Sequence, residues 1–300
     1  MFGAICGDVL GSTYEFHPTK VYGFPMFPSE SCVTDDTVLT AAVASALLRG
    51  RSFEVELKDW YGASSRDNFG AMFQAWAISP DGTVGTSAGN GACMRVSAIP
   101  LLSPSLAAAL ECAESCTRTS HDHPGSVRAA MATVAAKRLA HEGWSQADMA
   151  AVVGQAFGYD LATPLAATRR AYAFEPTAEM TVGPSLRAAV EATSFEDGMR
   201  RVISMGGDAD TMAATCGGVL EAYHPVTDPI RPFVEARLPG AVREVLAAYA
   251  ARVGAAPVGI TPRADVPGIL AKANARAGAP SRRGGALARL RGLLAGRPAR

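Results

Sequence analysis

The sequence predicts an all-α fold, a compact single-domain bundle of roughly ten helices. Apolar residues recur at helical spacing in many segments, and helix start and stop signals bound these segments. The period-two alternation of a half-buried strand is nearly absent. Hydrophobic residues make up 48% of the 300 positions, which is enough for a sizeable core.

The first predicted helix has a glycine at every fourth position, at Gly3, Gly7 and Gly11. Residues four apart lie on the same face of a helix, and glycines leave that face without side chains. Another backbone can therefore lie very close to it. We expect an interior helix at the start of the chain.

Capping residues, prolines and glycines give the bounds of the helices that follow. We expect a loop-rich region over 62–91, and within it residues 81–91 are too rich in glycine and hydroxyl side chains for regular structure. The pair Pro184-Ser185 predicts that one helix begins at residue 186. The predicted ranges are 38–48, 53–61, 106–117, 127–141, 146–157, 186–193, 199–205, 212–223 and 229–251.

The last part of the chain differs in composition from the rest. Lys and Arg balance Asp and Glu over the whole chain, but residues 271–300 hold eight basic residues and no acid. We expect a helical domain over 1–262 and a flexible basic tail rich in Ala, Gly, Arg and Pro over 263–300. The acidic body argues against a nucleic-acid-binding core and leaves only a weak tail contact of that kind.

Neither secretion nor a membrane span is expected. Asp8 interrupts the short apolar opening, and there is no uncharged apolar run of about 18 residues. The cysteines are too sparse for a disulfide framework and should be reduced. Cys112 and Cys116 lack a second Cys or His pair at the spacing of a zinc site. We expect a cytoplasmic protein with no membrane partner.

Two acidic stretches stand where helices are expected to begin. They are Thr34-Asp35-Asp36-Thr37 and Asp208-Ala209-Asp210-Thr211. Acidic residues there also complement the helix dipole, so one stretch alone identifies no site. If the two meet, four carboxylates in one cleft must bind cations or take up protons. Hard oxygen ligands favour magnesium, manganese or calcium over zinc, and two ions sharing a carboxylate fit the ligand count.

Five motifs in order resemble the ADP-ribosylglycohydrolase family over residues 3–224. A lone Asp-Asp pair would be weak support, but the ordered set is specific. The motifs are Gly3-Ala4-Ile5-Cys6-Gly7-Asp8-Val9-Leu10-Gly11 leading to Glu15, Thr34-Asp35-Asp36-Thr37, Gly89-Asn90-Gly91-Ala92-Cys93-Met94-Arg95, Thr119-Ser120-His121, and Gly206-Gly207-Asp208-Ala209-Asp210-Thr211.

The resemblance implies a central cleft that binds two divalent cations, Mg²⁺ or Mn²⁺. Glu15 matches a mobile glutamate of the family and is expected to act in acid-base catalysis or substrate gating. Asp35 is expected to orient the attacking water or a ribose hydroxyl. The implied ligands are Thr34, Asp35, Asp36 and Asp210 for one ion, and Asp208, Asp210 and Thr211 for the other, with Asp210 bridging.

Substrate contacts are expected at the second glycine-rich motif. In Ser87-Ala88-Gly89-Asn90-Gly91 the glycines let backbone N–H groups approach phosphate oxygens, so we assign Ser87, Gly89, Asn90 and Gly91 to a diphosphate. His121 matches a family histidine near the diphosphate and ribose. For stacking on adenine the sequence offers Tyr14, Phe16, Phe69 and Trp76 without choosing among them, and core packing is the default for each.

The resemblance thus implies a hydrolase that cleaves the glycosidic bond between ADP-ribose and an acceptor, either a modified protein side chain or a small molecule. Two alternatives remain open: a relative that binds ADP-ribose with little or no turnover, and a two-metal phosphohydrolase that cuts the diphosphate itself. Ala209 stands where many relatives have Thr or Ser. No residue identifies the acceptor.

Overall fold

The computed structural model describes residues 1–65, 68–255 and 258–279. These residues form helices, with two isolated β-bridges and no strand, which confirms the all-α prediction. In chain order the elements are α1 Phe2–Phe16, α2 Asp35–Arg49, α3 Phe53–Ala63, α4 Ala71–Ala77, α5 Gly91–Met94, η2 Val96–Ala98, α6 Ile99–Leu102, α7 Leu106–Arg118, α8 Pro124–His141, α9 Gln146–Phe157, α10 Leu165–Thr168, α11 Ala178–Glu191, α12 Phe195–Ile203, α13 Ala209–Leu220, α14 Ile230–Glu235, α15 Gly240–Ala255 and α16 Val266–Ala277.

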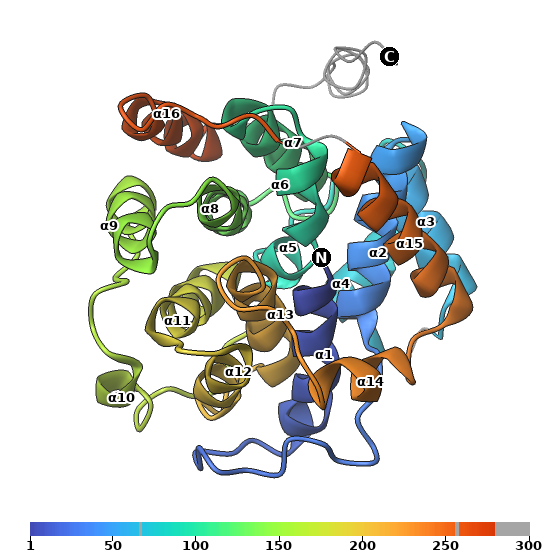
Figure 1. Cartoon of the computed structure of the whole chain (residues 1–300). Helices are drawn as coiled ribbons and strands as arrows, with labels where there is room; N and C mark the ends of the chain where they lie inside the picture. The colour runs from blue at the N-terminus through green and yellow to red at the C-terminus, as the bar shows by residue number, and fades with distance from the viewer. Residues whose placement is uncertain (66–67, 256–257, 280–300) are drawn as a thin grey trace.

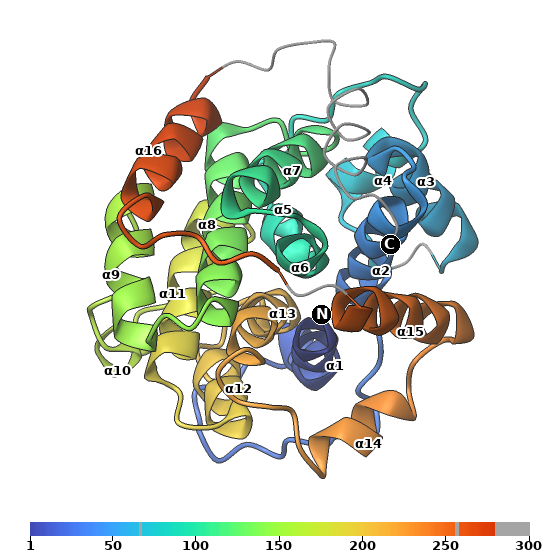
Figure 2. The same cartoon turned by 45° about the horizontal axis from the view of Figure 1, so that its top comes forward.

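Helices α1 and α13 pack backbone to backbone at the middle of the bundle, as Figures 1 and 2 show. A Cβ atom added at Gly7 would lie 2.0 Å from the carbonyl oxygen of Ala213. A Cβ atom added at Gly3 would lie 2.3 Å from the carbonyl oxygen of Gly217. The predicted smooth face of the first helix is confirmed, and α13 is the helix that lies on it.

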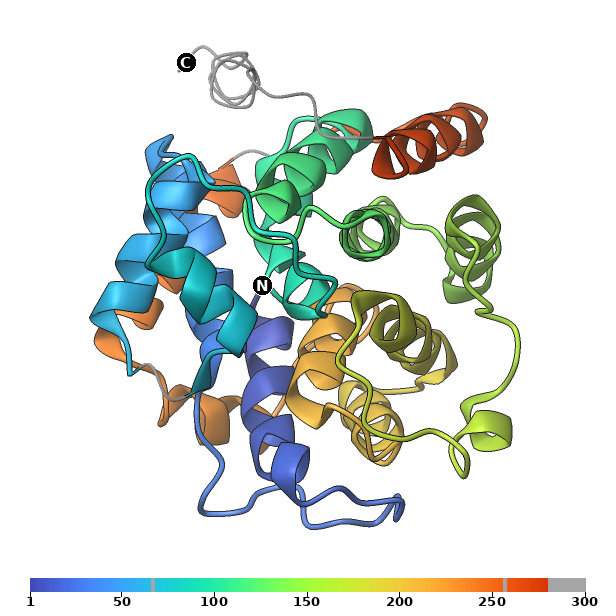
Figure 3. The same ribbon diagram turned by 180° about the vertical axis from the view of Figure 1, so that it is seen from behind.

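The other helices surround this pair. Helices α2, α3 and α15 lie on one side of it and α8, α9, α11 and α16 on the other (Figure 1). Seen from behind, the segment between α1 and α2 lies at the C-terminal end of α1 (Figure 3). None of the helices within 1–65, 68–255 and 258–279 is both long and apolar enough to cross a membrane.

The region expected to be loop-rich over 62–91 contains a helix, α4. Its buried Phe73 packs beside Trp76, Phe69 and Tyr61. An aromatic cluster of this kind can fix a short helix whatever the loop-like composition around it. The prediction is wrong for Ala71–Ala77.

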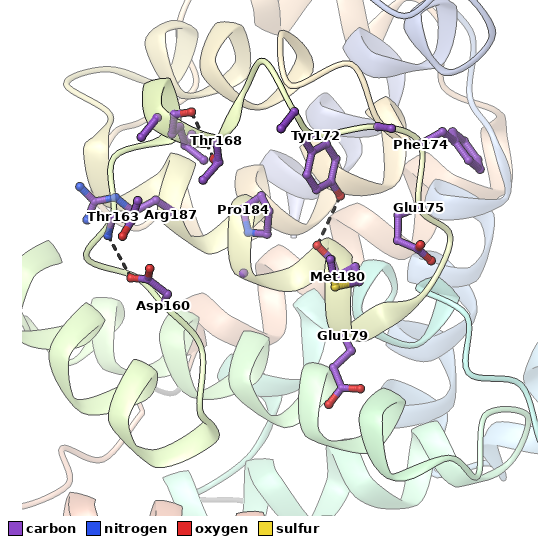
Figure 4. A pocket seen from close by; sticks show the side chains of 15 residues that line it. Asp160, Thr163, Thr168, Tyr172, Phe174, Glu175, Glu179, Met180, Pro184 and Arg187 are labelled. Atoms are coloured by element: carbon purple, nitrogen blue, oxygen red, sulfur yellow. Dashed lines mark hydrogen bonds between the residues drawn. The ribbon is translucent and has the colours of Figure 1, made fainter.

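Helix α11 begins at Ala178, eight residues before the predicted start, and Pro184 lies inside it. Proline has no N–H, so the carbonyl of Met180, four residues earlier, loses its helical donor. The Tyr172 hydroxyl donates to that carbonyl at 3.3 Å instead (Figure 4). A tertiary contact therefore compensates for the helix-breaking residue.

The helix predicted over 229–251 is two helices, α14 and α15, which are separated by residues 236–239. Pro239 lies in this gap, and its missing N–H and fixed φ disfavour a continuous helix. The segment turns here, so α15 packs against α2 and α14 against α1.

Part of the predicted flexible tail is ordered. Helix α16 buries Val266, Leu270, Ala273 and Ala277, which recur at helical spacing, against α7, α8 and α9. Its alanines made this apolar stripe look like low-complexity sequence. The flexible prediction is wrong for Val266–Ala277, and residues 280–300, where most of the tail's arginines stand, lie outside the described part of the chain.

We expect Gly7→Ala to lower the free energy of unfolding by at least about 2 kcal/mol, because the new methyl group meets a backbone carbonyl that cannot move alone. Gly62→Ala is the matched control, since Gly62 is helical and no atom lies within 4 Å of its added Cβ. It should be neutral or stabilising by up to about 1 kcal/mol. Urea unfolding followed by circular dichroism measures both, and equal stability of the two variants would disprove the packing argument.

Candidate functional site

The α1–α13 contact brings acidic side chains from distant parts of the chain together. Glu15 lies near the end of α1, while Asp208 and Asp210 lie at the start of α13. One carboxylate oxygen of each lies within 4.8 Å of the others. Asp208 and Asp210 are buried and Glu15 is partly exposed. Three carboxylates in this arrangement could hold a metal ion.

The first acidic stretch is fixed by a carboxylate that the sequence analysis did not assign to the site, Asp8. Thr34 caps α2, accepting from the Asp36 amide and donating its hydroxyl proton to Asp8 at 2.7 Å. The amides of Thr34 and Thr37 also donate to Asp8, at 3.2 and 3.1 Å. Asp8 is wholly buried. A carboxylate in the middle of an otherwise apolar, glycine-rich interior helix was the signal that could have identified it.

The two acidic stretches meet directly, as predicted. The Thr211 hydroxyl donates to Oδ2 of Asp36 at 3.1 Å, which joins the starts of α13 and α2. The other oxygen of Asp36, Oδ1, is buried with no hydrogen-bond partner among the described residues. A helix dipole favours an acid at each helix start, but it does not account for a buried carboxylate oxygen without a donor.

Burial raises the pKa values of five carboxyl groups at the site. It raises the pKa of Asp8 to about 6, and, together with neighbouring carboxylates, the pKa of Glu15 to about 7 and of Asp35 to about 8. The pKa values of Asp36 and Asp210 are raised for the same two reasons. Carboxylates that repel one another at low solvent exposure are stable when they bind protons or a cation. The orphan oxygen of Asp36 and the all-oxygen donor set therefore fit a hard divalent cation.

The predicted diphosphate loop is held by the segment before α11. The Asn90 amide donates to the Pro176 carbonyl at 2.8 Å, and the Gly89 amide donates to the Ser87 hydroxyl at 3.0 Å. Two of the amides expected to face phosphate are therefore occupied within the protein. The Asn90 side chain donates to Asp208 at 2.8 Å and to Thr181 at 3.2 Å, so it links this loop to the acidic cluster.

His121 lies against the same loop. Its backbone forms an isolated bridge with Thr86, and its ring is buried. The first atom that a Cβ at Gly91 would meet is His121 Nε2, at 3.2 Å, and from Gly89 the same nitrogen would be 3.7 Å away. The structure thus brings together the histidine and the glycines that the sequence assigned to one ligand.

A cavity of about 610 Å³ lies between α11 and residues 160–175, and Figure 4 shows the side chains around it. None of the predicted site residues lines it. The cavity nevertheless adjoins the acidic cluster, because the ring of its lining residue Tyr172 lies on Gly207, where an added Cβ would be 2.5 Å from the ring. Phe174, also in the lining, is 52% exposed.

The aromatic side chains considered from the sequence lie elsewhere. Tyr14, Phe69 and Trp76 are buried in the core, whereas Phe16 is 76% exposed beside Glu15. Tyr172 was missed because its place depends on the loop between α10 and α11, which carries no motif.

Lys20 ties this loop to the second acidic stretch. Its ammonium group donates to the carbonyl oxygens of Arg169 at 2.9 Å, Tyr172 at 2.5 Å, and Met205. Met205 directly precedes Gly206-Gly207, and Lys20 follows Glu15 by five residues. The Lys20 side chain therefore joins three segments: the one that follows Glu15, the cavity wall at Tyr172, and the residues that precede Asp208.

Comparison with known proteins identifies the family and supports the fold. The family model described as ADP-ribosylglycohydrolase matches residues 1–261. A solved structure titled "ADP-ribosylglycohydrolase-related protein complex" aligns with a TM-score of 0.62 and 21% identity, over 91% of this chain and 95% of that chain, so the two share a fold. No curated protein matches the chain. On the family match over most of its length, the chain belongs to the ADP-ribosylglycohydrolase family.

Proposed function

We propose that the protein is a metal-dependent hydrolase that cleaves the glycosidic bond between ADP-ribose and an acceptor, releasing ADP-ribose. The observation that carries this proposal is the buried, mutually repelling carboxylate cluster in a chain of this family. The acceptor is a modified protein side chain or a small molecule. All six cysteines are free, which suits a reducing compartment, and we place the enzyme in the cytoplasm.

The cluster would hold two divalent cations, Mg²⁺ or Mn²⁺. When bound, the ions supply positive charge that offsets the carboxylates and lowers the pKa of a bound water or hydroxyl. Asp8 holds the turn that presents the first stretch, and Asn90 holds Asp208 from the opposite side. The assigned ligands are Thr34, Asp35, Asp36, Asp208, Asp210 and Thr211.

Two carboxylates are assigned to the chemistry. Asp35 starts α2 and orients the attacking water or a ribose hydroxyl by accepting its hydrogen bond. Glu15 is partly exposed and has a pKa raised to about 7, so it can exchange a proton with the leaving group near neutral pH. Its position in the last turn of α1, next to the exposed Phe16, gives it access to a substrate entering from solvent.

The rest of ADP-ribose is assigned to the neighbouring features. The diphosphate is assigned to Ser87, Gly89 and Gly91, beside His121. The Asn90 side chain positions Asp208 by donating a hydrogen bond to it. The cavity lined by Tyr172 and Phe174 offers aromatic faces to the adenine ring.

Asp35→Asn and Asp210→Asn should reduce turnover by at least about 10³-fold, because each removes a carboxylate from the reacting cluster. Mass spectrometry of a panel of arginine-, serine- and nucleotide-linked ADP-ribose measures the products, and circular dichroism checks the fold. Asp59→Asn, an exposed change in α3, is the control and should retain activity. Full activity in either cluster variant would disprove the assignment. AMP in place of ADP-ribose as product would identify a phosphohydrolase.

Divalent cations should stabilise the protein more at about pH 8 than at about pH 5. The folded carboxyl groups of Asp8, Glu15 and Asp35 have pKa values raised above those of the unfolded chain, so without a cation their contribution is favourable at low pH and is lost as the pH rises through 6 to 8. A cation replaces the lost protons, and at low pH it competes with them. Thermal unfolding with Mg²⁺ or with a chelator measures the Tm shift at each pH, and we expect the shift at pH 8 to be larger by roughly several degrees. An equal shift at both pH values, or a shift retained in Asp210→Asn, would contradict the cation site.

Glu15→Gln should slow turnover by roughly 10²- to 10⁴-fold, since the amide cannot transfer a proton. The variant should keep most of the thermal stabilisation by Mg²⁺, because Glu15 is not among the assigned ligands. Steady-state kinetics and thermal unfolding give the two readouts. Loss of both would make Glu15 a metal ligand, and loss of neither would remove it from the site.

A further inference from the structure

Arg95 is a buried cation that the proposed reaction does not use. Its side chain has no solvent exposure, and no ion pair of the described residues includes it. One nitrogen, Nη2, donates to the Ser120 hydroxyl at 2.8 Å, with a longer contact of 3.4 Å to the Cys116 carbonyl. Its Nε and Nη1 atoms have no partner among the described residues. A buried guanidinium without a carboxylate is costly, so its retained contact with Ser120 calls for an explanation.

The contact continues to His121. The Ser120 oxygen lies 2.8 Å from His121 Nδ1, and both residues are buried. A serine hydroxyl has one proton to donate, and this oxygen already accepts from Arg95. Nδ1 is the acceptor within reach of that proton, so the hydroxyl is satisfied when Nδ1 carries no hydrogen. The proton of a neutral imidazole is then on Nε2.

The Nε2 edge faces the glycine loop. A Cβ atom added at Gly91 would lie 3.2 Å from His121 Nε2, and one added at Gly89 would lie 3.7 Å from the same nitrogen. Burial, and then the charge of Arg95, lower the pKa of His121 well below its ordinary value. The ring is therefore uncharged, and it presents a hydrogen-bond donor where the loop has no side chains.

We propose that Arg95 and Ser120 are positioning residues that hold His121 as a neutral imidazole protonated on Nε2, so that it donates a hydrogen bond to the anionic oxygens of a nucleoside diphosphate over Gly89 and Gly91. The arrangement makes His121 a fixed donor and not a proton-transfer group. The choice of ligand rests on the proposed function. The tautomer does not, because it is a property of the protein without substrate.

Nitrogen-15 NMR of the histidine rings in the free protein tests the tautomer. His121→Gln identifies the His121 signals among those of the five histidines. In the wild type we expect a protonated Nε2 and an unprotonated Nδ1 at neutral pH. Ser120→Ala should move the ring toward the other tautomer, while Ser120→Thr, which keeps a hydroxyl, should not. A wild-type ring protonated on Nδ1 overturns the proposal without any variant, as does a Ser120→Ala spectrum equal to that of the wild type.

Calorimetric titration with ADP-ribose tests the donor. Ser120→Ala should weaken binding by roughly threefold to tenfold, the effect of one misaligned hydrogen bond. Ser97→Ala is the matched control, since Ser97 is a buried serine whose hydroxyl has no partner among the described residues, and its affinity should equal that of the wild type. Equal losses in both variants would overturn the assigned role. If the wild type has the Nε2 proton but binds no ADP-ribose, the positioning holds and the proposed function fails.

Discussion

The contact between the backbones of α1 and α13 is the constraint on which the site depends. Three glycines of α1 lie on the carbonyls of α13, and the separation leaves no room for a methyl group. This contact fixes which residues of two helices distant in sequence face one another. Glu15 thereby comes close to Asp208 and Asp210, and Asp8, on the same helix, binds the capping turn at the start of α2. Close packing at the centre thus determines the electrostatics of the acidic cluster.

The carboxylates of the acidic cluster in turn interact unfavourably with one another. Burial raises the pKa values of five carboxyl groups, and repulsion between neighbouring carboxylates raises four of them further, those of Glu15, Asp35, Asp36 and Asp210. A fold with no use for them would replace such groups with apolar side chains of similar size. Their retention is understandable if a cation is part of the native state. The buried His121 ring lies against the glycine loop, where Nε2 would offer a hydrogen bond to an anionic ligand under the proposed tautomer.

Motifs made of chemistry-bearing residues were predictable, and so was the glycine face of α1, because each depends on local spacing. The features that sequence did not reveal depend on tertiary contacts. Pro184 is tolerated in α11 because Tyr172 donates to the carbonyl that the proline leaves free. Helix α16 is ordered because its alanine-rich stripe meets α7, α8 and α9. The contact between the Asn90 side chain and Asp208 was not predicted, since nothing in the motif shows that the side-chain amide reaches this carboxylate.

The contact between Asn90 and Asp208 changes how the site is understood. Asn90 stands in the loop assigned to the diphosphate, yet its side chain is bound to Asp208 and Thr181, from the acidic cluster and from α11. Backbone hydrogen bonds join the loop to the residues at the start of α11. Helix α11 also forms one wall of the cavity that Tyr172 lines. Cluster, loop and cavity therefore share one set of contacts. A displacement of α11 would be transmitted to the carboxylates as well as to the loop, so the ligand-binding and charge-bearing parts form a single unit rather than adjacent sites.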